Sequence, residues 1–344
     1  MNLALFDTHG YDRASFEAAN PAFGHDLTFL EPRLTAATAA LARGHAGVCS
    51  FVNDRVDAAA LESLRDGGTK LVALRSAGYN HVDLAAAAKL GLRVTRVPEY
   101  SPYAVAEHAV CLALALNRKV HRAYARVREW NFSLEGLVGF DLHGKTAGIV
   151  GTGRIGRAAA RIFHGFGCRV LAWDARPDAS LQSEAGARYV ELDELLRESD
   201  VVSLHVPLTP QTNHLIDAKA FALMKPGAML VNTGRGALID SRALIHALKS
   251  GRLGAAGLDV YEVEEGVFFQ DLSNTVLQDD VLARLLTFPN VLVTSHQAFL
   301  TREALAAIAQ TTLQSAADFE AGRPLVNEVR VEQVFQAHAA SRRR

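Results

Sequence analysis

The sequence is poor in cysteine and has no excess of charge of either sign. Its 344 residues include three cysteines, Cys49, Cys111 and Cys168, which lie far apart in apolar surroundings. This spacing argues against a disulfide framework, fits a reducing compartment, and predicts that each cysteine is a small buried residue. The 36 lysines and arginines nearly balance the 37 aspartates and glutamates. We therefore expect no nucleic-acid partner, and we interpret residues 342–344, all arginine, as a solvated tail.

Long apolar runs are also absent. The first residues, MNLALFDTHGYDR, carry no basic leader and are interrupted by Asp7, so we expect no signal peptide. No apolar stretch reaches the length of a membrane span. His205 and His214 lack the spacing of metal ligands, and the chain has no HExxH motif. These absences predict a cytoplasmic protein with no membrane partner and no bound metal.

Short apolar runs alternate with helical patterns along the whole chain, which is typical of parallel βαβ units. The length predicts about two domains. In the first third we expect five strands joined by helices, among them 58–64 with Asp57 as its cap, and 84–90. The five strands are expected at residues 3–6, 27–30, 46–51, 71–74 and 93–97.

A helical stretch over residues 104–130 follows, and Ser101 and Pro102 precede it as a cap and a first-turn proline. The alternation then resumes with six predicted strands, the number in a full dinucleotide-binding sheet. These strands are expected at residues 146–150, 169–173, 201–205, 229–232, 255–258 and 291–294. We expect the last helix, about 302–321, to return to the first domain.

The segment GIVGTGRIGRAAARIF, residues 148–163, places three glycines between a predicted strand and a predicted helix. In this setting Gly151 permits the tight turn, Gly153 lets a pyrophosphate approach the backbone, and Gly156 lets the helix pack on the strand. Asp174 ends the next predicted strand, where a carboxylate accepts hydrogen bonds from the ribose of NAD and repels the 2′-phosphate of NADP. Arg176 lies two residues after Asp174 and could reach the 2′-phosphate of NADP, so the preference for NAD stays open at this point.

We therefore predict an α/β protein with two doubly wound parallel-sheet domains. A Rossmann NAD-binding domain, residues 103–296, is expected to be inserted in a flavodoxin-like substrate domain formed by residues 1–102 and 297–344.

Three polar residues follow the ends of later strands in the second predicted sheet. Arg235 follows LVNTG, Glu264 follows GLDVYEV, and His296 follows VLVTS. Singly, they have ordinary interpretations as an ion-pair partner, a member of the acidic surface run 262–265, and a loop histidine. Together, at the edge where ligands of such sheets bind, they supply a cation for a carboxylate, an acid–base group, and a carboxylate that orients it. The joint occurrence favours a catalytic site beside a nicotinamide.

Several segments resemble the D-isomer-specific 2-hydroxyacid dehydrogenases, in order and over nearly the whole chain. They are RSAGYNHVDLAAA, VPEYSPYAVAEHA, GKTAGIVGTGRIG, VSLHVPLTPQTNHLI, LVNTGRGALID, GLDVYE and TSHQAFLT. Within the family, FFQDLSNTVLQDDVLARLL and HQAFLT are most similar to bacterial fermentative D-lactate dehydrogenases. The resemblance implies a homodimer in which the 104–130 region packs across the two-fold axis.

The resemblance also implies roles for individual residues. Arg235 would bind the substrate carboxylate and polarise the keto oxygen, and Glu264 and His296 would be the acid–base pair. The other implied substrate contacts are Ala77, Gly78, Tyr79, Tyr100 and Phe299, the last as an apolar wall. The other implied cofactor contacts are Arg154, Ile155, Val206, Pro207, Thr212, Thr233, Gly234 and Asp259, with Arg235 beside the nicotinamide. The chain departs from the family at Gly234, commonly serine or alanine, and at Ser295, often proline.

We thus expect reversible hydride transfer between NADH and pyruvate, giving D-lactate, with His296 as the proton donor. One alternative keeps this mechanism and enlarges the substrate to branched or aromatic 2-keto acids. Another is a non-catalytic NAD-sensing binding protein, because transcriptional corepressors of the family share the fold.

Overall fold

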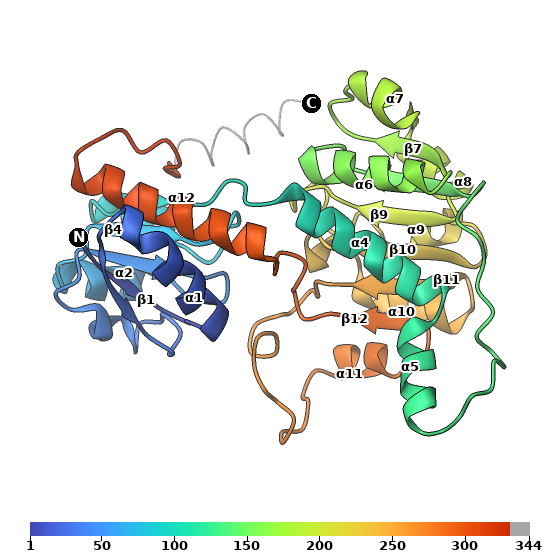
Figure 1. The fold of residues 1–344 in the computed structure, drawn as a ribbon, viewed down its shortest axis with the longest axis horizontal. Coiled ribbons are helices and arrows are strands. Elements are labelled where there is room, and N and C mark those ends of the chain that lie inside the picture. The colour runs from blue at the N-terminus through green and yellow to red at the C-terminus, as the bar shows by residue number, and fades with distance from the viewer. Residues whose placement is uncertain (331–344) are drawn as a thin grey trace. The chain divides into compact units, whose positions relative to one another are not determined.

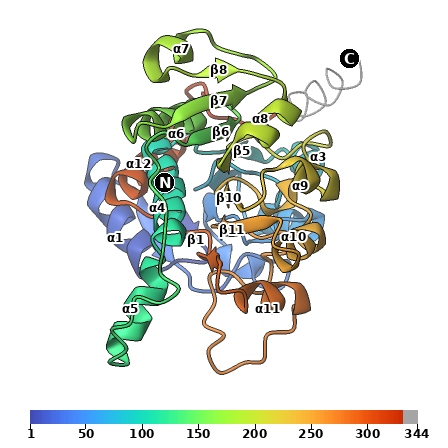
Figure 2. The same cartoon turned by 90° about the vertical axis from the view of Figure 1, so that its right-hand side faces the viewer.

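The computed structural model describes residues 1–330, and the predicted solvated tail, residues 342–344, lies outside them. The chain divides into two compact units (Figures 1 and 2). The first unit comprises Met1–Ser101 and the chain from Leu300 onward, and the second comprises Pro102–Phe299. Among residues 1–330, no helix combines the length and the apolar character needed to cross a bilayer.

The first unit contains a five-stranded parallel sheet with the strand order β2-β1-β3-β4-β5. All five predicted strands are present, as β1 (Asn2–Leu5), β2 (Asp26–Phe29), β3 (Gly47–Ser50), β4 (Leu71–Leu74) and β5 (Arg93–Thr95). The helices are α1 (Gly10–Ala19), α2 (Ala58–Asp66), α3 (Leu84–Lys89) and α12 (Arg302–Glu320). The predicted cap of α2 is confirmed, because the Asp57 side chain accepts a hydrogen bond from the Ala60 N–H.

Both faces of this sheet are covered, because successive side chains of a strand point to opposite sides. In β1, Leu3 and Leu5 pack in a core with Phe16 of α1 and Leu313 of α12. On the other face, Ala4 belongs to a core formed with α2 and α3. The sheet therefore forms the middle layer of a three-layer unit.

The second unit contains a seven-stranded parallel sheet with the order β12-β11-β10-β9-β6-β7-β8. The six predicted strands are present as β6 (Thr146–Val150), β7 (Arg169–Trp173), β9 (Val201–Leu204), β10 (Ala228–Asn232), β11 (Leu253–Leu258) and β12 (Val291–Val293). The seventh strand, β8 (Arg188–Tyr189), was not predicted because two residues are too few to show an alternating pattern.

Helices cover both faces of this sheet as well. Figure 2 shows α4 (Pro102–Asn117) on one side of the strands and α9 (Ala218–Leu223) and α10 (Ser241–Lys249) on the other. The remaining helices are α5 (Val120–Arg128), α6 (Arg154–Gly165), α7 (Ser180–Ala185), α8 (Leu192–Glu198) and α11 (Asp280–Leu286). Because the strands are parallel, β6, β7 and β9 to β12 all end at one edge, where the polar residues singled out above follow them.

The helical stretch predicted over 104–130 is two helices rather than one. It breaks between α4 and α5 at Lys119, whose φ of 50° is in the left-handed region that an α-helix cannot contain. The buried face of α4 packs against α6 and β11, whereas α5 has no buried residue within this chain. A helical pattern that continues across a break does not reveal the break, because a single residue with left-handed backbone is enough to end one helix and begin the next.

The cysteine prediction is confirmed for two residues and wrong for the third. All three cysteines lie in the described part of the chain and are free thiols, Cys49 and Cys168 being buried and Cys111 exposed. In α4, helical periodicity directs Ala109, Leu112 and neighbouring residues toward the core, and Cys111 lies on the opposite face.

Candidate active site

The three predicted phosphate-loop glycines occupy a turn between β6 and α6, each under a different constraint. Gly151 has a φ of 93°, a conformation that side chains disfavour. At Gly156 an added Cβ would lie 1.9 Å from the Gly151 carbonyl oxygen, so only glycine lets the helix approach the strand this closely. At Gly153 an added Cβ would meet no atom of the described residues within 4 Å. Its neighbourhood is therefore open on the side where a ligand would approach.

The first turn of α6 fits a phosphate group. Gly153 is the N-cap residue and has no side chain to cap the helix, so its first backbone N–H groups point outward. Arg154 and Ile155 are the first two residues of α6, and Arg154 is exposed. At the end of β10, the Thr233 hydroxyl is buried and has no hydrogen-bond partner among the described residues. A bound nicotinamide cofactor would supply partners for these polar groups.

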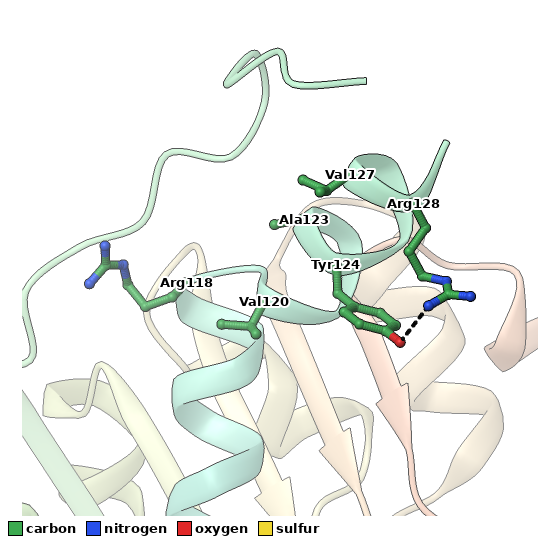
Figure 3. Close-up of a pocket in the computed structure, with 6 residues that line it drawn as sticks. All are labelled: Arg118, Val120, Ala123, Tyr124, Val127 and Arg128. Carbon is green, nitrogen blue, oxygen red and sulfur yellow. Dashed lines mark hydrogen bonds between the residues drawn. The ribbon is translucent and has the colours of Figure 1, made fainter. Parts of the chain in front are cut away.

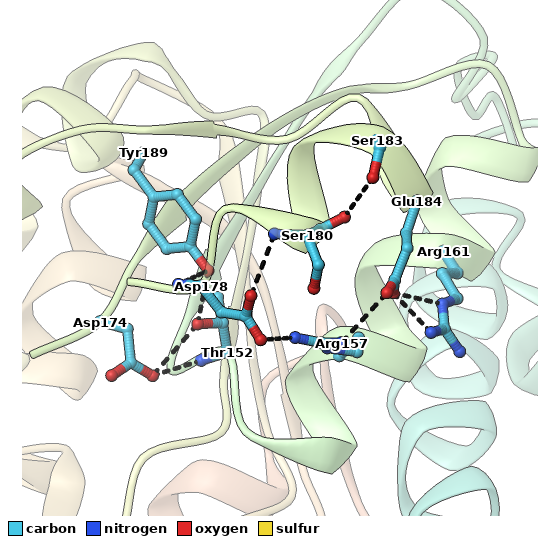
Figure 4. Close-up of polar contacts among 9 residues, drawn as sticks. All are labelled: Thr152, Arg157, Arg161, Asp174, Asp178, Ser180, Ser183, Glu184 and Tyr189. Carbon is cyan, nitrogen blue, oxygen red and sulfur yellow. Dashed lines mark hydrogen bonds and ion pairs between the residues drawn. The ribbon is translucent and has the colours of Figure 1, made fainter. Parts of the chain in front are cut away.

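Asp174 follows β7 and is held beside the glycine turn (Figure 4). Its Oδ2 accepts hydrogen bonds from the Thr152 N–H at 2.6 Å and from Thr152 Oγ1 at 3.2 Å. Its Oδ1 accepts one from the Arg176 N–H at 2.8 Å. The Tyr189 hydroxyl of β8 donates to Thr152 Oγ1 at 2.9 Å. The carboxylate is thus oriented by the turn that carries Gly151 and Gly153.

The loop after β7 is also attached to α6. Arg157 pairs with both Asp178 and Glu184, and Arg161 pairs with Glu184, as Figure 4 shows. These contacts hold the segment after Asp174 against the helix whose N-terminus would receive the phosphates. The predicted adenine-side residues lie after β9, where Val206 is buried and Thr212 Oγ1 donates to the Pro207 carbonyl oxygen at 2.6 Å.

Arg235 begins a turn after β10 and is half-buried. Its backbone is fixed by Asn232, whose Oδ1 accepts from the Gly234 N–H at 3.0 Å and whose Nδ2 donates to the Arg235 carbonyl oxygen at 2.9 Å. The guanidinium Nη1 donates to the Gly234 carbonyl oxygen at 2.7 Å. Asn232 itself is fully buried, and its role was not predicted from the sequence because a buried asparagine has no signature apart from its partners.

Glu264 and His296 are in direct contact. His296 Nδ1 lies 2.8 Å from Glu264 Oε2, and each side chain is about one-fifth exposed, at 21 % and 19 %. Glu264 Oε1 accepts a second hydrogen bond from the Tyr261 N–H at 3.0 Å. A carboxylate acceptor at Nδ1 selects the tautomer protonated there and leaves Nε2 for a reacting group. The ring of Phe269 lies beside the imidazole, with centroids 5.9 Å apart.

Asp259 anchors the turn that carries His296. Its carboxylate is buried and accepts hydrogen bonds from the Gln297 N–H at 2.8 Å, the Ala298 N–H at 2.9 Å and Thr294 Oγ1 at 2.7 Å. Burial by itself would raise the pKa of Asp259, but contacts from His108, Thr294 and Ala298 hold that pKa below its ordinary value. The carboxylate is thus kept charged within a closed turn.

His108 of α4 was not predicted as part of this region. Its Nε2 lies 3.0 Å from Thr294 Oγ1 and 3.4 Å from Asp259 Oδ1. Nothing near His108 in the sequence indicates these contacts, because its partners follow it by more than a hundred residues.

The predicted substrate residues Ala77, Gly78, Tyr79 and Tyr100 lie in the first unit, where the loop after β4 makes contacts of its own. Ser76 Oγ donates to the Gly78 carbonyl oxygen at 2.8 Å. Arg96 Nη1 donates to the Ala77 carbonyl oxygen at 3.0 Å, and the Arg96 guanidinium lies 5.4 Å from the centroid of the Tyr79 ring. Phe299, the predicted apolar wall, is buried at the end of the second unit.

Within the second unit, Arg235, Glu264 and His296 follow three neighbouring strands, β10, β11 and β12. The arrangement offers a guanidinium for an anion, an imidazole with one free nitrogen, and a carboxylate behind it. Such a set can bind an acid and move a proton to or from an adjacent oxygen.

Comparison with known proteins gives one family and close relatives. Residues 110–298 match the family model described as D-isomer specific 2-hydroxyacid dehydrogenase, NAD binding domain. The chain is 54 % identical to a D-lactate dehydrogenase of Escherichia coli (strain K12), over 96 % of this chain and 100 % of that one.

Solved structures agree over nearly the full length. The pyruvate reductase of Chlamydomonas reinhardtii is similar with a TM-score of 0.91 and 48 % identity, covering 95 % of this chain and 98 % of that one. A D-lactate dehydrogenase with NAD+ from Lactobacillus jensenii is similar with a TM-score of 0.81 and 33 % identity, covering 96 % and 99 %.

Proposed function

Because the chain belongs to the D-isomer specific 2-hydroxyacid dehydrogenase family and is an NAD-dependent oxidoreductase, we propose that it reduces pyruvate to D-lactate reversibly. The observation that carries this proposal is the 2.8 Å contact between His296 and Glu264, which follow the two strands beside the strand of Arg235 in the same sheet. The similarity to a D-lactate dehydrogenase at 54 % identity supports pyruvate as the substrate. The family and the relatives are NAD-dependent dehydrogenases, so we do not propose the alternative of a non-catalytic NAD-sensing protein.

The residues of this chain would divide the work as follows. Gly151, Gly153 and the first turn of α6 would hold the pyrophosphate, Asp174 the adenine ribose, and Thr233 the nicotinamide end. When bound, NADH supplies the hydride that reduces the keto carbon. His296 donates a proton from Nε2 to the keto oxygen, while Glu264 stabilises the charged form of the ring that carries it.

Arg235 binds the substrate carboxylate and stabilises negative charge on the keto oxygen. The family resemblance assigns further contacts with the carboxylate to the backbone of Ala77 and Gly78, to Tyr79 and to the hydroxyl of Tyr100. It assigns Phe299 to the apolar side of the substrate. Pyruvate, whose side chain is one methyl group, is the 2-keto acid that this assignment suits.

The test is turnover with NADH and three acids, pyruvate, 2-ketobutyrate and phenylpyruvate, followed by chiral analysis of the product. We expect pyruvate to have the highest kcat/KM, 2-ketobutyrate to be modestly lower, since one methylene changes binding by about 1–3 kcal/mol, and phenylpyruvate to be clearly lower. L-lactate as the product would contradict the stereochemistry. Preference for phenylpyruvate would support the alternative of a larger 2-keto acid.

We also propose that a second copy of the chain covers the apolar face of α5 and the segment after it. A groove of about 640 Å³ along α5 is lined by Arg118, Val120, Ala123, Tyr124, Val127 and Arg128, and Figure 3 shows these side chains. Tyr124 is 65 % exposed and Trp130 is 84 % exposed, and further exposed apolar side chains follow. Several large apolar side chains exposed on and after one helix are typical of an interface, and the near-zero net charge does not oppose self-association. The segment lies within the region that the family resemblance assigns to the two-fold axis.

A cytoplasmic location is the remaining part of the proposal. The three free cysteines support it, because disulfides are rare in that reducing compartment. The near balance of acidic and basic residues supports a small-molecule substrate rather than nucleic acid as the partner.

A further inference from the structure

The second unit contains another histidine–glutamate pair, two residues away from Glu264 in the sequence. His214 Nε2 lies 2.6 Å from Glu262 Oε1, and the side chains are 38 % and 28 % exposed. His214 belongs to the segment after β9, and Glu262 to the segment after β11. These strands lie on either side of β10, whose end carries Arg235.

On one side, the backbone around His214 is paired with the turn that Arg235 begins. The His214 N–H donates to the Ala237 carbonyl oxygen at 2.8 Å, and the Ile216 N–H donates to the Leu238 carbonyl oxygen at 3.0 Å. His214 has a φ of 51°, a left-handed conformation that is uncommon for residues other than glycine. The segment is therefore shaped to fit against this turn.

On the other side, the backbone of Glu262 lies directly against the same turn. A Cβ on Gly236 would be 2.0 Å from the Tyr261 carbonyl carbon and 2.4 Å from the Glu262 nitrogen, so the two backbones touch. Glu262 Oε2 also accepts from the Ser241 N–H at 3.4 Å. The Tyr261 N–H, next in the chain, donates to Glu264. The Arg235 turn and the Glu264 turn thus share one contact surface.

We propose that His214 and Glu262 are a positioning pair. The pair holds the Arg235 turn against residues 261–264 and so fixes the position of Arg235 relative to Glu264. The inference rests on the proposed function, and neither side chain is assigned a contact with substrate. A partly exposed contact between two polar side chains adds little to global stability. A small misplacement of a substrate-binding arginine, in contrast, lowers the rate by up to about 100-fold.

The same unit offers a matched control. Lys225 Nζ pairs with Asp200 Oδ1 at 3.0 Å, and these side chains are 37 % and 26 % exposed, almost as in the first pair. Asp200 and Lys225 precede β9 and β10, so they lie at the opposite edge of the sheet from Arg235. Lys225→Ala therefore removes a side-chain contact of similar length and exposure without touching the site.

The experiment compares Glu262→Ala, His214→Ala, the double variant and Lys225→Ala in the full chain. We expect either single change at the pair to lower kcat for pyruvate about 10- to 100-fold and to leave the Kd of NADH within about twofold. The double variant should lose no more than the worse single one, because both disrupt one contact. With NADH deuterated at the transferred position, the isotope effect on kcat should rise above that of Lys225→Ala. Glu262→Gln, which keeps an acceptor for His214, should recover most of the rate.

Other results overturn the inference. Rates equal to those of Lys225→Ala, or multiplicative losses in the double variant, would show that the pair does not act through Arg235 and Glu264. A higher Kd of NADH with unchanged kcat would show that the pair supports the cofactor-binding segment instead. If the unmodified protein prefers another 2-keto acid, the same comparison is made with that acid. If it reduces none, the proposed function fails and this inference fails with it.

Discussion

At the scale of single residues, Arg235 is expected to act through its shape as well as its charge. Arg235→Lys keeps the cation but replaces a planar fork, which holds a carboxylate with two parallel hydrogen bonds, by a point charge. We expect kcat/KM for pyruvate to fall at least about 100-fold, with losses in both kcat and KM, because hydride transfer needs an aligned keto carbon. Steady-state kinetics with NADH measure this. A lysine variant close to the original rate would make Arg235 a structural residue.

Glu264 is expected to act on the reaction through His296. Its Oε2 lies 2.8 Å from His296 Nδ1 and fixes the orientation of the ring. Glu264→Gln keeps a hydrogen-bond acceptor but removes the carboxylate charge, so kcat for pyruvate should fall about tenfold or more while the Kd of NADH is retained. His296→Ala removes the proton donor and should lower kcat by about 100-fold or more, again with NADH affinity retained. Turnover of the His296→Ala variant close to that of the unmodified protein would identify another proton donor.

Asp174 is expected to determine the choice between NADH and NADPH. A 2′-phosphate beside this carboxylate is repelled, so NADH should bind more tightly. Asp174→Ala should narrow the difference in Kd about tenfold or more, mainly by improving NADPH relative to NADH. Asp193→Ala, which removes an exposed carboxylate of α8, is the control. Equal affinity of the unmodified protein for both cofactors would contradict the assignment.

At the scale of elements, two glycines of the turn between β6 and α6 are expected to have different roles, Gly156 in packing and Gly153 in ligand binding. Gly156→Ala places a Cβ 1.9 Å from a carbonyl oxygen and should lower the free energy of unfolding by about 1–3 kcal/mol. Gly153→Ala meets no described atom within 4 Å and has a φ of −61°, so its stability should stay within about 0.5 kcal/mol. Yet its methyl group lies where a pyrophosphate would approach, and the Kd of NADH should rise about tenfold. Denaturant unfolding measures the stability of both variants, and fluorescence titration measures their Kd for NADH. Equal losses of stability in the two variants would contradict the prediction.

At the scale of the whole molecule, the exposed apolar surface of α5 predicts self-association. Replacing Tyr124 and Val127 together by glutamate should convert the proposed dimer to a monomer, because two charges would have to be buried without partners. Val276→Glu, at a residue that is 77 % exposed outside this surface, should leave the dimer intact. Sedimentation velocity measures the mass of each form. If the unmodified chain is monomeric at micromolar concentration, the interface proposal is wrong.

Much of this molecule follows from local patterns in the chain. The six predicted strands of the second unit, the glycine turn before α6, and Asp174 at the end of β7 depend on neighbours within a few residues. Parallel topology then places the ends of β10, β11 and β12 together, so Arg235, Glu264 and His296 could be singled out before any coordinates. Where the signal is short or the backbone turns over one residue, as at β8 and Lys119, the prediction was incomplete.

Only the tertiary structure decided which other polar groups meet. The contact between Glu264 and His296 was expected from the family resemblance, whereas nothing in the sequence indicated that Glu262 of the same acidic run faces His214. The exposed position of Cys111 likewise depends on which face of α4 the neighbouring helix and strands cover. A hydrogen bond between residues distant in the sequence depends on how whole elements pack. The sequence pattern around each residue does not show that packing. The sequence therefore determined the elements and the edge at which the site lies, and the packing of those elements decided its internal contacts.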